Sequence, residues 1–101
     1  MVVVIDKDER RLYLSEAILA KLRFAVAPFA TAEQALLAMQ ALRPEIIVAG
    51  EDELRELDGR LPTDRDGEEI PLLALTPDLT EPAALIEALR EVIARHRTDA
   101  S

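Results

Sequence analysis

The chain has 101 residues, half of them hydrophobic and only 3% aromatic, which is enough for one domain with a mostly aliphatic core. Twelve basic residues against twenty acidic ones give a formal net charge of −8, which disfavours direct contact with nucleic acid or an anionic membrane surface. The absence of cysteine excludes disulfides, thiolate zinc sites and cysteine nucleophiles.

The N-terminal segment predicts a buried strand followed by an amphipathic helix. Val2–Ile5 is a continuous β-branched run, as in strands covered on both faces. The run stops at Asp6, which makes it too short for a signal peptide or a membrane span, so we expect a cytoplasmic protein. Asp8 is the expected N-cap of a helix that begins at Glu9. The apolar face of this helix comprises Leu14, Ile18 and Leu22, widened by Leu12 and Leu19.

A second strand and a second helix follow. Phe24–Phe29 has the composition of a strand, and Pro28 places it at a sheet edge because proline has no backbone donor. Thr31 and Gln34 have the spacing of a capping box, which predicts a helix rich in alanine and leucine that runs to Leu42.

The third strand leads into an acidic segment. Pro44 blocks further helix, and Glu45–Ala49 is the predicted strand. Residues 51–69 hold nine acidic and three basic residues, and therefore carry −6 of the net charge of −8. Within them we expect one or two helical turns over Glu51–Leu57. Residues 58–69 are expected to form a loop. The acidic stretch 51–69 as a whole is expected to be solvated, with docking of a basic partner as the functional alternative.

The C-terminal quarter predicts one more strand and one more helix. Pro71–Thr76 is the strand, and Pro77 ends it. Thr80 is the expected N-cap of the last helix, with Pro82 in the first turn, where proline is tolerated. This helix is expected to end near His96, and its apolar stripe comprises Leu85, Leu89, Val92 and Ile93.

The alternation of strands and helices predicts the overall topology. It indicates an α/β fold with an open parallel sheet of four strands joined by right-handed crossovers. The first strand is expected to lie centrally and the Phe24–Phe29 strand at one edge, which gives the order 2-1-3-4. Sites in such sheets form beyond the carboxyl ends of the strands. The residues expected there are Asp6, Lys7, Asp8, Gly50, Glu51 and Thr76.

Three segments, in their order and spacing, resemble the receiver (CheY-like) domain of two-component response regulators, which has a flavodoxin-like fold. They are Val-Val-Ile-Asp at residues 3–6, Arg-Pro-Glu-Ile-Ile-Val at residues 43–48 and Ile-Pro-Leu-Leu-Ala-Leu-Thr at residues 70–76. The resemblance covers residues 1–76 and then the final helix, so residues 1–101 are identified as a single truncated receiver-like domain. It implies that the fourth helix and fifth strand of a full receiver, with a lysine at the end of that strand, are missing.

The resemblance also implies which parts of the receiver pocket are lost. The phosphoacceptor aspartate of the family corresponds to Gly50, which has no side chain. The acidic pair that holds a divalent cation corresponds to Asp6 and Lys7, so the stronger ligand position carries a positive charge. Thr76 matches the hydroxyl residue that senses the phosphoryl group. Of five pocket roles, Asp6 and Thr76 remain.

These departures bear on the chemistry that we expect. Magnesium prefers a near-octahedral set of oxygen ligands, and Lys7 would repel it. We therefore expect no catalytic residue, no cofactor and weak or lost magnesium binding, with Lys7 as a fixed internal counter-ion of the pocket. The alternative is a working receiver with a displaced acceptor carboxylate, namely Asp8, Glu51 or Asp52. Against this, Asp8 is more simply a helix cap, and strand alternation points Glu51 away from Asp6.

The shortened C-terminal part also predicts an interface. Without a fifth strand, the Pro71–Thr76 strand becomes a sheet edge with unpaired backbone groups, and exposed edges need a cover. In receivers the missing region is also the usual dimerisation and output surface. We therefore expect a homodimer that buries this edge or one side of the last helix, with candidate interface residues Leu72, Leu73, Leu75, Leu85 and Leu89.

The sequence thus predicts a pseudo-receiver that cannot be phosphorylated and acts by protein–protein interaction or dimerisation in two-component or phosphorelay signal transduction. The main alternative is the working receiver with a displaced acceptor. A third possibility is a small flavodoxin-like ligand-binding domain, but no glycine-rich phosphate loop follows the first strand. A catalytic enzyme has the least support, because the one histidine, His96, is a basic helix terminus and no serine lies near a base.

Overall fold

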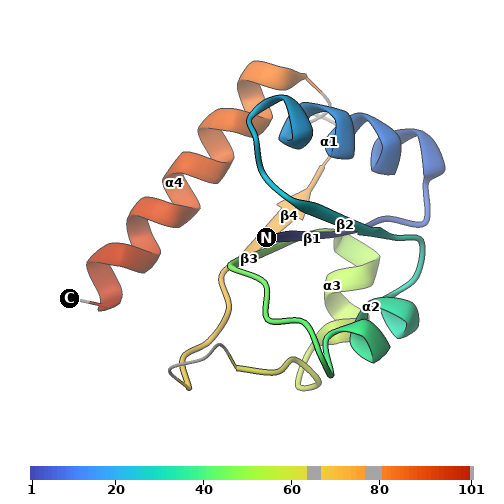
Figure 1. Ribbon diagram of the computed structural model, residues 1–101, viewed down its shortest axis with the longest axis vertical. Coiled ribbons are helices and arrows are strands. Elements are labelled where there is room, and N and C mark those ends of the chain that lie inside the picture. Colours follow the sequence, from blue (N-terminus) through green and yellow to red (C-terminus); the bar gives the residue numbers. More distant parts are fainter. Residues whose placement is uncertain (64–66, 77–80, 101) are drawn as a thin grey trace.

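The computed structural model describes residues 1–63, 67–76 and 81–100, with side chains described up to Arg95. Four strands form one sheet in the order β2-β1-β3-β4, and every neighbouring pair is parallel. The predicted flavodoxin-like α/β arrangement and its strand order are therefore confirmed (Figure 1). The elements are β1 (Val2–Ile5), α1 (Glu9–Lys21), β2 (Val26–Phe29), α2 (Ala32–Ala38), β3 (Ile46–Gly50), α3 (Glu51–Leu57), β4 (Leu72–Leu75) and α4 (Pro82–Ala100).

Two layers of helices enclose the sheet. Helices α1 and α4 cover one face, and helices α2 and α3 cover the other (Figure 1). Because successive strand residues point to opposite faces, β1 supplies Val2 and Val4 to the first layer and Val3 and Ile5 to the second. All four side chains are fully buried, which is why this strand is β-branched throughout and contains no polar residue.

Both predicted N-caps before the third strand are confirmed. The side chain of Asp8 accepts hydrogen bonds from the backbone N–H groups of Arg10 and Arg11 at the start of α1. Thr31 Oγ1 accepts one from the backbone N–H of Gln34 at 3.2 Å and starts α2. The predicted cap Thr80 lies outside the described residues.

The structure corrects the predicted end of the second helix. Helix α2 ends at Ala38, whereas its alanine and leucine content predicted an end at Leu42. Beyond Ala38 the backbone tightens, with Gln40 N–H donating to the carbonyl of Leu37 three residues earlier. The guanidinium of Arg43 then donates to the carbonyl of Met39 and to that of Leu42, so it closes the helix end just before Pro44.

The second strand also begins later than predicted, at Val26 instead of Phe24. The cause is a left-handed residue, Arg23, whose φ is 67°. It follows the C-cap Leu22, and Phe24 N–H then donates to the carbonyl of Leu19, which closes α1 as a Schellman-type turn. This turn leaves the side chain of Leu22 at the surface, so the predicted apolar stripe of α1 ends at Ile18 and Leu19.

The acidic segment is more structured than a solvated loop. The helical turns predicted over Glu51–Leu57 are present as α3. After α3, Leu61 packs against the α2–α3 side of the core, and Thr63 forms an isolated antiparallel bridge with Glu69. Leu57 and Ile70 are buried on the same side, whereas the charged side chains described within residues 51–63 and 67–69, apart from Glu53, face solvent.

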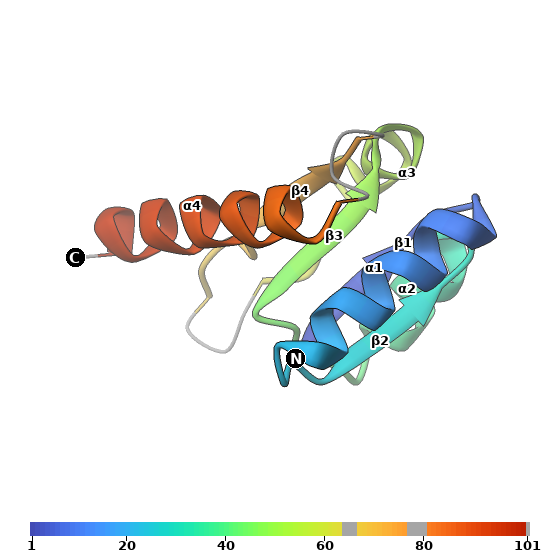
Figure 2. The same cartoon turned by 90° about the horizontal axis from the view of Figure 1, so that it is seen from above.

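Helix α4 lies over β4 through Leu85 and Leu89, with Val92 packed at the rim of the same core. It runs to Ala100, beyond the predicted end near His96, because the sequence contains no glycine or proline stop signal after Pro82. Its C-terminal half extends past the sheet (Figures 1 and 2). No helix in the described ranges is long and apolar enough to cross a membrane.

The contact of α4 with the sheet gives a first prediction. Leu85 is fully buried, whereas Leu37 on α2 is 69% exposed. Replacing Leu85 with alanine is expected to lower the free energy of unfolding by about 2–5 kcal/mol, because it removes buried methyl groups and leaves a cavity. Urea denaturation measures this change. The control, Leu37→Ala, is expected to stay within about 0.5 kcal/mol of the parent, and equal costs for the two variants would contradict the α4 packing.

Candidate functional site

Asp6 lies directly after the carboxyl end of β1, and its carboxylate is completely buried. Its Oδ2 accepts a hydrogen bond from Nε of Arg11 at 2.9 Å, and its Oδ1 accepts one from Nη2 of Arg11 at 3.1 Å. The backbone N–H of Asp8 donates to the same Oδ1 at 2.9 Å. Three charge-assisted or backbone hydrogen bonds therefore satisfy the carboxylate without any outside ligand.

Arg11 comes from the first turn of α1, which the Asp8 cap starts directly beyond the strand. Its side chain is 25% exposed, so the guanidinium lies between the buried carboxylate and solvent. The hydrogen bonds that Arg11 donates to Asp6 raise the pKa of Arg11 above its usual value, which keeps the cation charged at every physiological pH. A buried carboxylate requires such a partner, because an unpaired charge in the interior is strongly disfavoured.

A second buried carboxylate, Glu53, occupies the space beside Gly50. Glu53 is 4% exposed, and its Oε1 accepts the backbone N–H of Lys7 at 3.2 Å. A Cβ atom added to Gly50 would overlap Oε2 of Glu53 and would lie 3.7 Å from Oδ1 of Asp6. The backbone of Gly50 is extended, with φ of −60°, so its conformation does not itself require glycine. Instead, the absence of a side chain at position 50 leaves room for the Glu53 carboxylate.

The structure gives Lys7 a different role from the one predicted. Its Nζ pairs with Oδ2 of Asp52 at 2.6 Å, and both side chains are more than half exposed. The counter-ion that Asp6 contacts is Arg11 and not Lys7, because the alternation of residues after β1 carries the Lys7 side chain outward over α3. The hypothesis that Lys7 neutralises the pocket is therefore corrected.

The Lys7–Asp52 pair sets the local pH response. Its hydrogen bond and charge raise the pKa of Lys7 and lower the pKa of Asp52. Since the carboxyl pKa is lower in the folded state, the pair contributes stability above the ordinary aspartate pKa. That contribution is lost as the pH falls through the lowered pKa of Asp52. The pair is solvent-exposed, so this contribution is small.

A hollow of about 260 Å³ lies at this end of the sheet, next to the Arg11 guanidinium; we call it the Arg11 hollow. It brings two of the predicted site residues together, Glu51 at the start of α3 and Thr76 just after β4. Glu51 begins a helix and does not continue the strand, so the strand-alternation argument that pointed it away does not apply. Its lining residues are Arg11, Glu51, Asp52, Glu53, Leu75 and Thr76.

The donor set of this region does not fit a divalent cation. Asp6 already binds a guanidinium, and Asp8 accepts from backbone N–H groups of α1. Within residues 1–63, 67–76 and 81–95, whose side chains the structure describes, no three histidine, cysteine or carboxylate side chains gather as metal ligands. A magnesium ion would have to displace Arg11 before it could reach Asp6.

Two residues that organise the site, Arg11 and Glu53, were not predicted from the sequence. Arg11 lies five residues after Asp6, across a strand-to-helix turn, and Glu53 lies three residues after Gly50. The signal for Glu53 was available, because residues three apart on a helix lie on the same side, so a side chain at that distance returns over the start of its own helix.

The predicted interface set is also divided by the structure. Leu75, Leu85 and Leu89 are buried in the chain's own core, so they are removed from the candidate surface. Leu73 is half-buried, and Leu72 is 42% exposed on β4.

No family model, curated protein or solved structure matches this chain.

The overlap between position 50 and Glu53 gives a second prediction. Gly50→Ala is expected to lower the free energy of unfolding by about 1 kcal/mol, because the Glu53 carboxylate must leave its buried place and the Lys7 amide loses its acceptor. In a Glu53→Ala background the same change should cost nothing, or stabilise by about 0.4–1 kcal/mol, since alanine restricts the unfolded chain. Urea denaturation of the four proteins completes the double-mutant cycle.

The matched background for this cycle is Glu56→Ala, which removes an exposed carboxylate from the same helix. There the cost of Gly50→Ala should equal its cost in the parent protein. An identical cost in the Glu53→Ala and Glu56→Ala backgrounds would refute the coupling between positions 50 and 53.

Proposed function

We propose that this chain is a receiver-like signalling domain that does not carry out phosphoryl transfer and acts by protein–protein contact. Three supports converge: the parallel sheet in the order β2-β1-β3-β4, the order of the segments that resemble a receiver, and the chemistry at the carboxyl ends of β1 and β3. On this proposal the domain works in a two-component or phosphorelay assembly, as a constitutive adaptor or as a dimerisation module.

One observation carries the proposal: protein groups already fill the places that phosphoryl transfer would need. The transfer requires a placed nucleophile and a cation that offsets charge on the transferring oxygens. Position 50 has no side chain, and Glu53 occupies the volume beside it. The carboxylate of Asp6 is bound by Arg11 and by a backbone N–H. A site satisfied in this way supports a fixed conformation and does not support turnover.

The same proposal assigns a self-association surface. In the described part of the chain, β4 pairs with β3 along one side, and its other side forms the edge of the sheet. Leu72 on this strand is 42% exposed, although strand edges in monomers are usually short, charged or covered. A second copy that adds its own β4 to this edge would supply the missing backbone partners and bury Leu72.

The loss of phosphoryl chemistry is tested by intact-mass spectrometry. After incubation with acetyl phosphate and magnesium, we expect no adduct of about 80 Da, the mass of one phosphoryl group. A phosphorylatable receiver domain treated in parallel is the positive control.

A stoichiometric adduct would overturn the proposal in favour of a working receiver with a displaced acceptor. Peptide mapping would then identify the acceptor among Asp8, Glu51 and Asp52. Of these three, Glu51 and Asp52 line the Arg11 hollow, and Asp52 also pairs with Lys7.

The self-association surface is tested by sedimentation equilibrium over a range of protein concentrations. The parent is expected to sediment as a dimer, and Leu72→Lys as a monomer, because a charge at the paired edge is costly to bury. Leu22→Lys is the matched control, since Leu22 is 39% exposed but lies at the end of α1. A parent monomer at all concentrations, or an equal effect of both variants, would exclude the β4 interface.

A further inference from the structure

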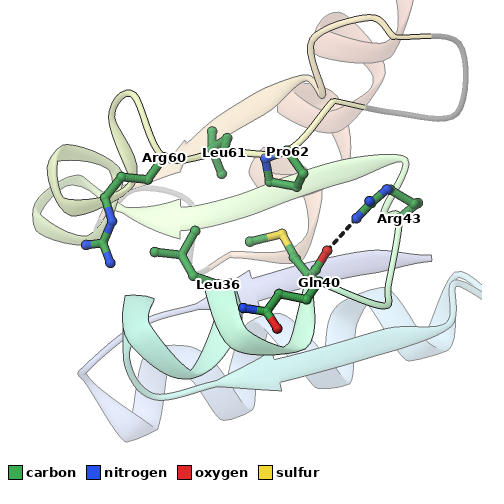
Figure 3. Close-up of a pocket in the computed structure, with 7 residues that line it drawn as sticks. Leu36, Gln40, Arg43, Arg60, Leu61 and Pro62 are labelled. Atoms are coloured by element: carbon green, nitrogen blue, oxygen red, sulfur yellow. Dashed lines mark hydrogen bonds between the residues drawn. The ribbon is translucent and has the colours of Figure 1, made fainter.

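A second hollow lies on the α2–α3 side of the sheet, between α2 and the segment that follows α3; we call it the α2 groove. It has a volume of about 320 Å³ and shares no residue with the Arg11 hollow. Its middle is apolar, formed by the half-buried side chains of Leu36, Leu61 and Pro62 around the buried Met39. Figure 3 shows α2 below and the segment with Leu61 and Pro62 above.

An arginine stands at each end of this apolar middle, Arg60 at one end and Arg43 at the other (Figure 3). Arg43 is anchored by Nη1, which donates to the backbone carbonyls of Met39 and Leu42. Arg60 also uses Nη1, which donates to Glu33 at 2.8 Å and to the carbonyl of Glu56 at 3.4 Å. These contacts use one nitrogen of each guanidinium, and an arginine carries five N–H donors.

The two arginines give the α2 groove a positive charge in an otherwise acidic chain. The chain carries a net charge of −8, yet the groove is lined by two cations and no carboxylate. The nearest anion partner, Glu33, lies outside the lining and pairs with Arg60 at a site where both side chains are about half exposed or more. Exposed pairs of this kind contribute little to stability, so an incoming carboxylate can replace Glu33 at small cost.

We propose that the α2 groove binds a peptide segment of a partner protein in which a few aliphatic residues lie between two acidic residues. The acidic residues would pair with Arg43 and Arg60, and the aliphatic side chains would contact the apolar middle. Gln40, which lines the groove, offers an amide that can bond the peptide backbone. Charge complementarity selects this partner, because a basic or neutral segment would leave Arg43 without a counter-charge and Arg60 with only the exposed Glu33.

The surface around the groove favours a peptide over a free dicarboxylic acid. Leu37 is 69% exposed near the end of α2, and its carbonyl accepts the backbone N–H of Gln40, which lines the groove. A peptide can cover this leucine in addition to the groove, whereas a small diacid cannot. The proposal depends only on these residues, so it stands whether or not the domain is a pseudo-receiver.

The test uses the whole chain, labelled with ¹⁵N, and a set of synthetic peptides. Each peptide has two glutamates separated by one, two or three leucines, capped at both ends and flanked by serine. We expect at least one peptide at up to about 1 mM to shift the amide signals of Leu36, Gln40 and Leu61. The counterpart in which both glutamates are replaced by glutamine should bind at least about ten-fold more weakly.

Four single variants and one double variant locate the charge recognition. Arg43→Gln and Arg60→Gln should each weaken binding about three-fold, and the double variant about ten-fold. Glu33→Gln should tighten binding about two-fold, because Arg60 then has no competing carboxylate. Arg90→Gln, which removes an exposed arginine from α4, should leave binding unchanged. Circular dichroism of each variant separates loss of binding from loss of fold, and Glu33→Gln keeps both arginines in place.

Each other outcome overturns the proposal. The absence of shifts with every peptide, shifts confined to other surfaces, or equal binding of the glutamine counterpart would exclude recognition by the two arginines. Adipate that binds as tightly as the best peptide would assign the groove to a small diacid. None of these results would bear on the acetyl phosphate experiment, which probes the Arg11 hollow.

Discussion

The buried pair between Asp6 and Arg11 is the interaction on which the rest of this site depends. It joins the end of the central strand to the first turn of α1, in a place where an unpaired carboxylate would be strongly disfavoured. Removing one member of a buried pair typically costs about 3–5 kcal/mol, although the pair as a whole adds little over an apolar contact. The pair therefore specifies one arrangement of strand and helix more than it adds stability.

The other charged side chains near this pair fall into two groups, one buried and one exposed to solvent. Glu53 is buried and held by the Lys7 amide, whereas the Lys7 side chain and Asp52 meet in solvent. Buried groups fix geometry because their hydrogen bonds are satisfied within the protein, and exposed groups remain exchangeable because water competes for them. The same contrast applies to the α2 groove, where Met39 is buried and the Arg60–Glu33 pair is exposed. The site around Asp6 is thus fixed by its buried groups, whereas the α2 groove is bordered by an exposed and exchangeable ion pair.

The sequence predicted the framework better than the details of the site. The β-branched run Val2–Ile5 and the alternation of strands with helices along the chain were sufficient to predict the parallel sheet. A strand that is buried on both faces allows few arrangements. The short side-chain caps at Asp8 and Thr31 were equally readable, since their bonds are local. The left-handed Arg23 was not, because nothing in its side chain marks a helix end where glycine is usual. Arg11 escaped prediction because its role arises from a contact across a turn, which depends on where the chain folds back. Glu53 was missed although its three-residue spacing from Gly50 was a readable signal.

The crowding between position 50 and Glu53 has a consequence for how such a sequence can change over generations. Any mutation that introduces a side chain at position 50 meets a buried carboxylate, and any mutation that removes Glu53 leaves the Lys7 amide without its acceptor. Each step alone carries a penalty, and the loss of Glu53 removes the clash at position 50 but leaves the Lys7 amide unpaired. The stability cost of a side chain at position 50 therefore depends on whether Glu53 is present, and each route away from this arrangement begins with a destabilising mutation. A lineage that has reached this arrangement is therefore held in it by its own packing.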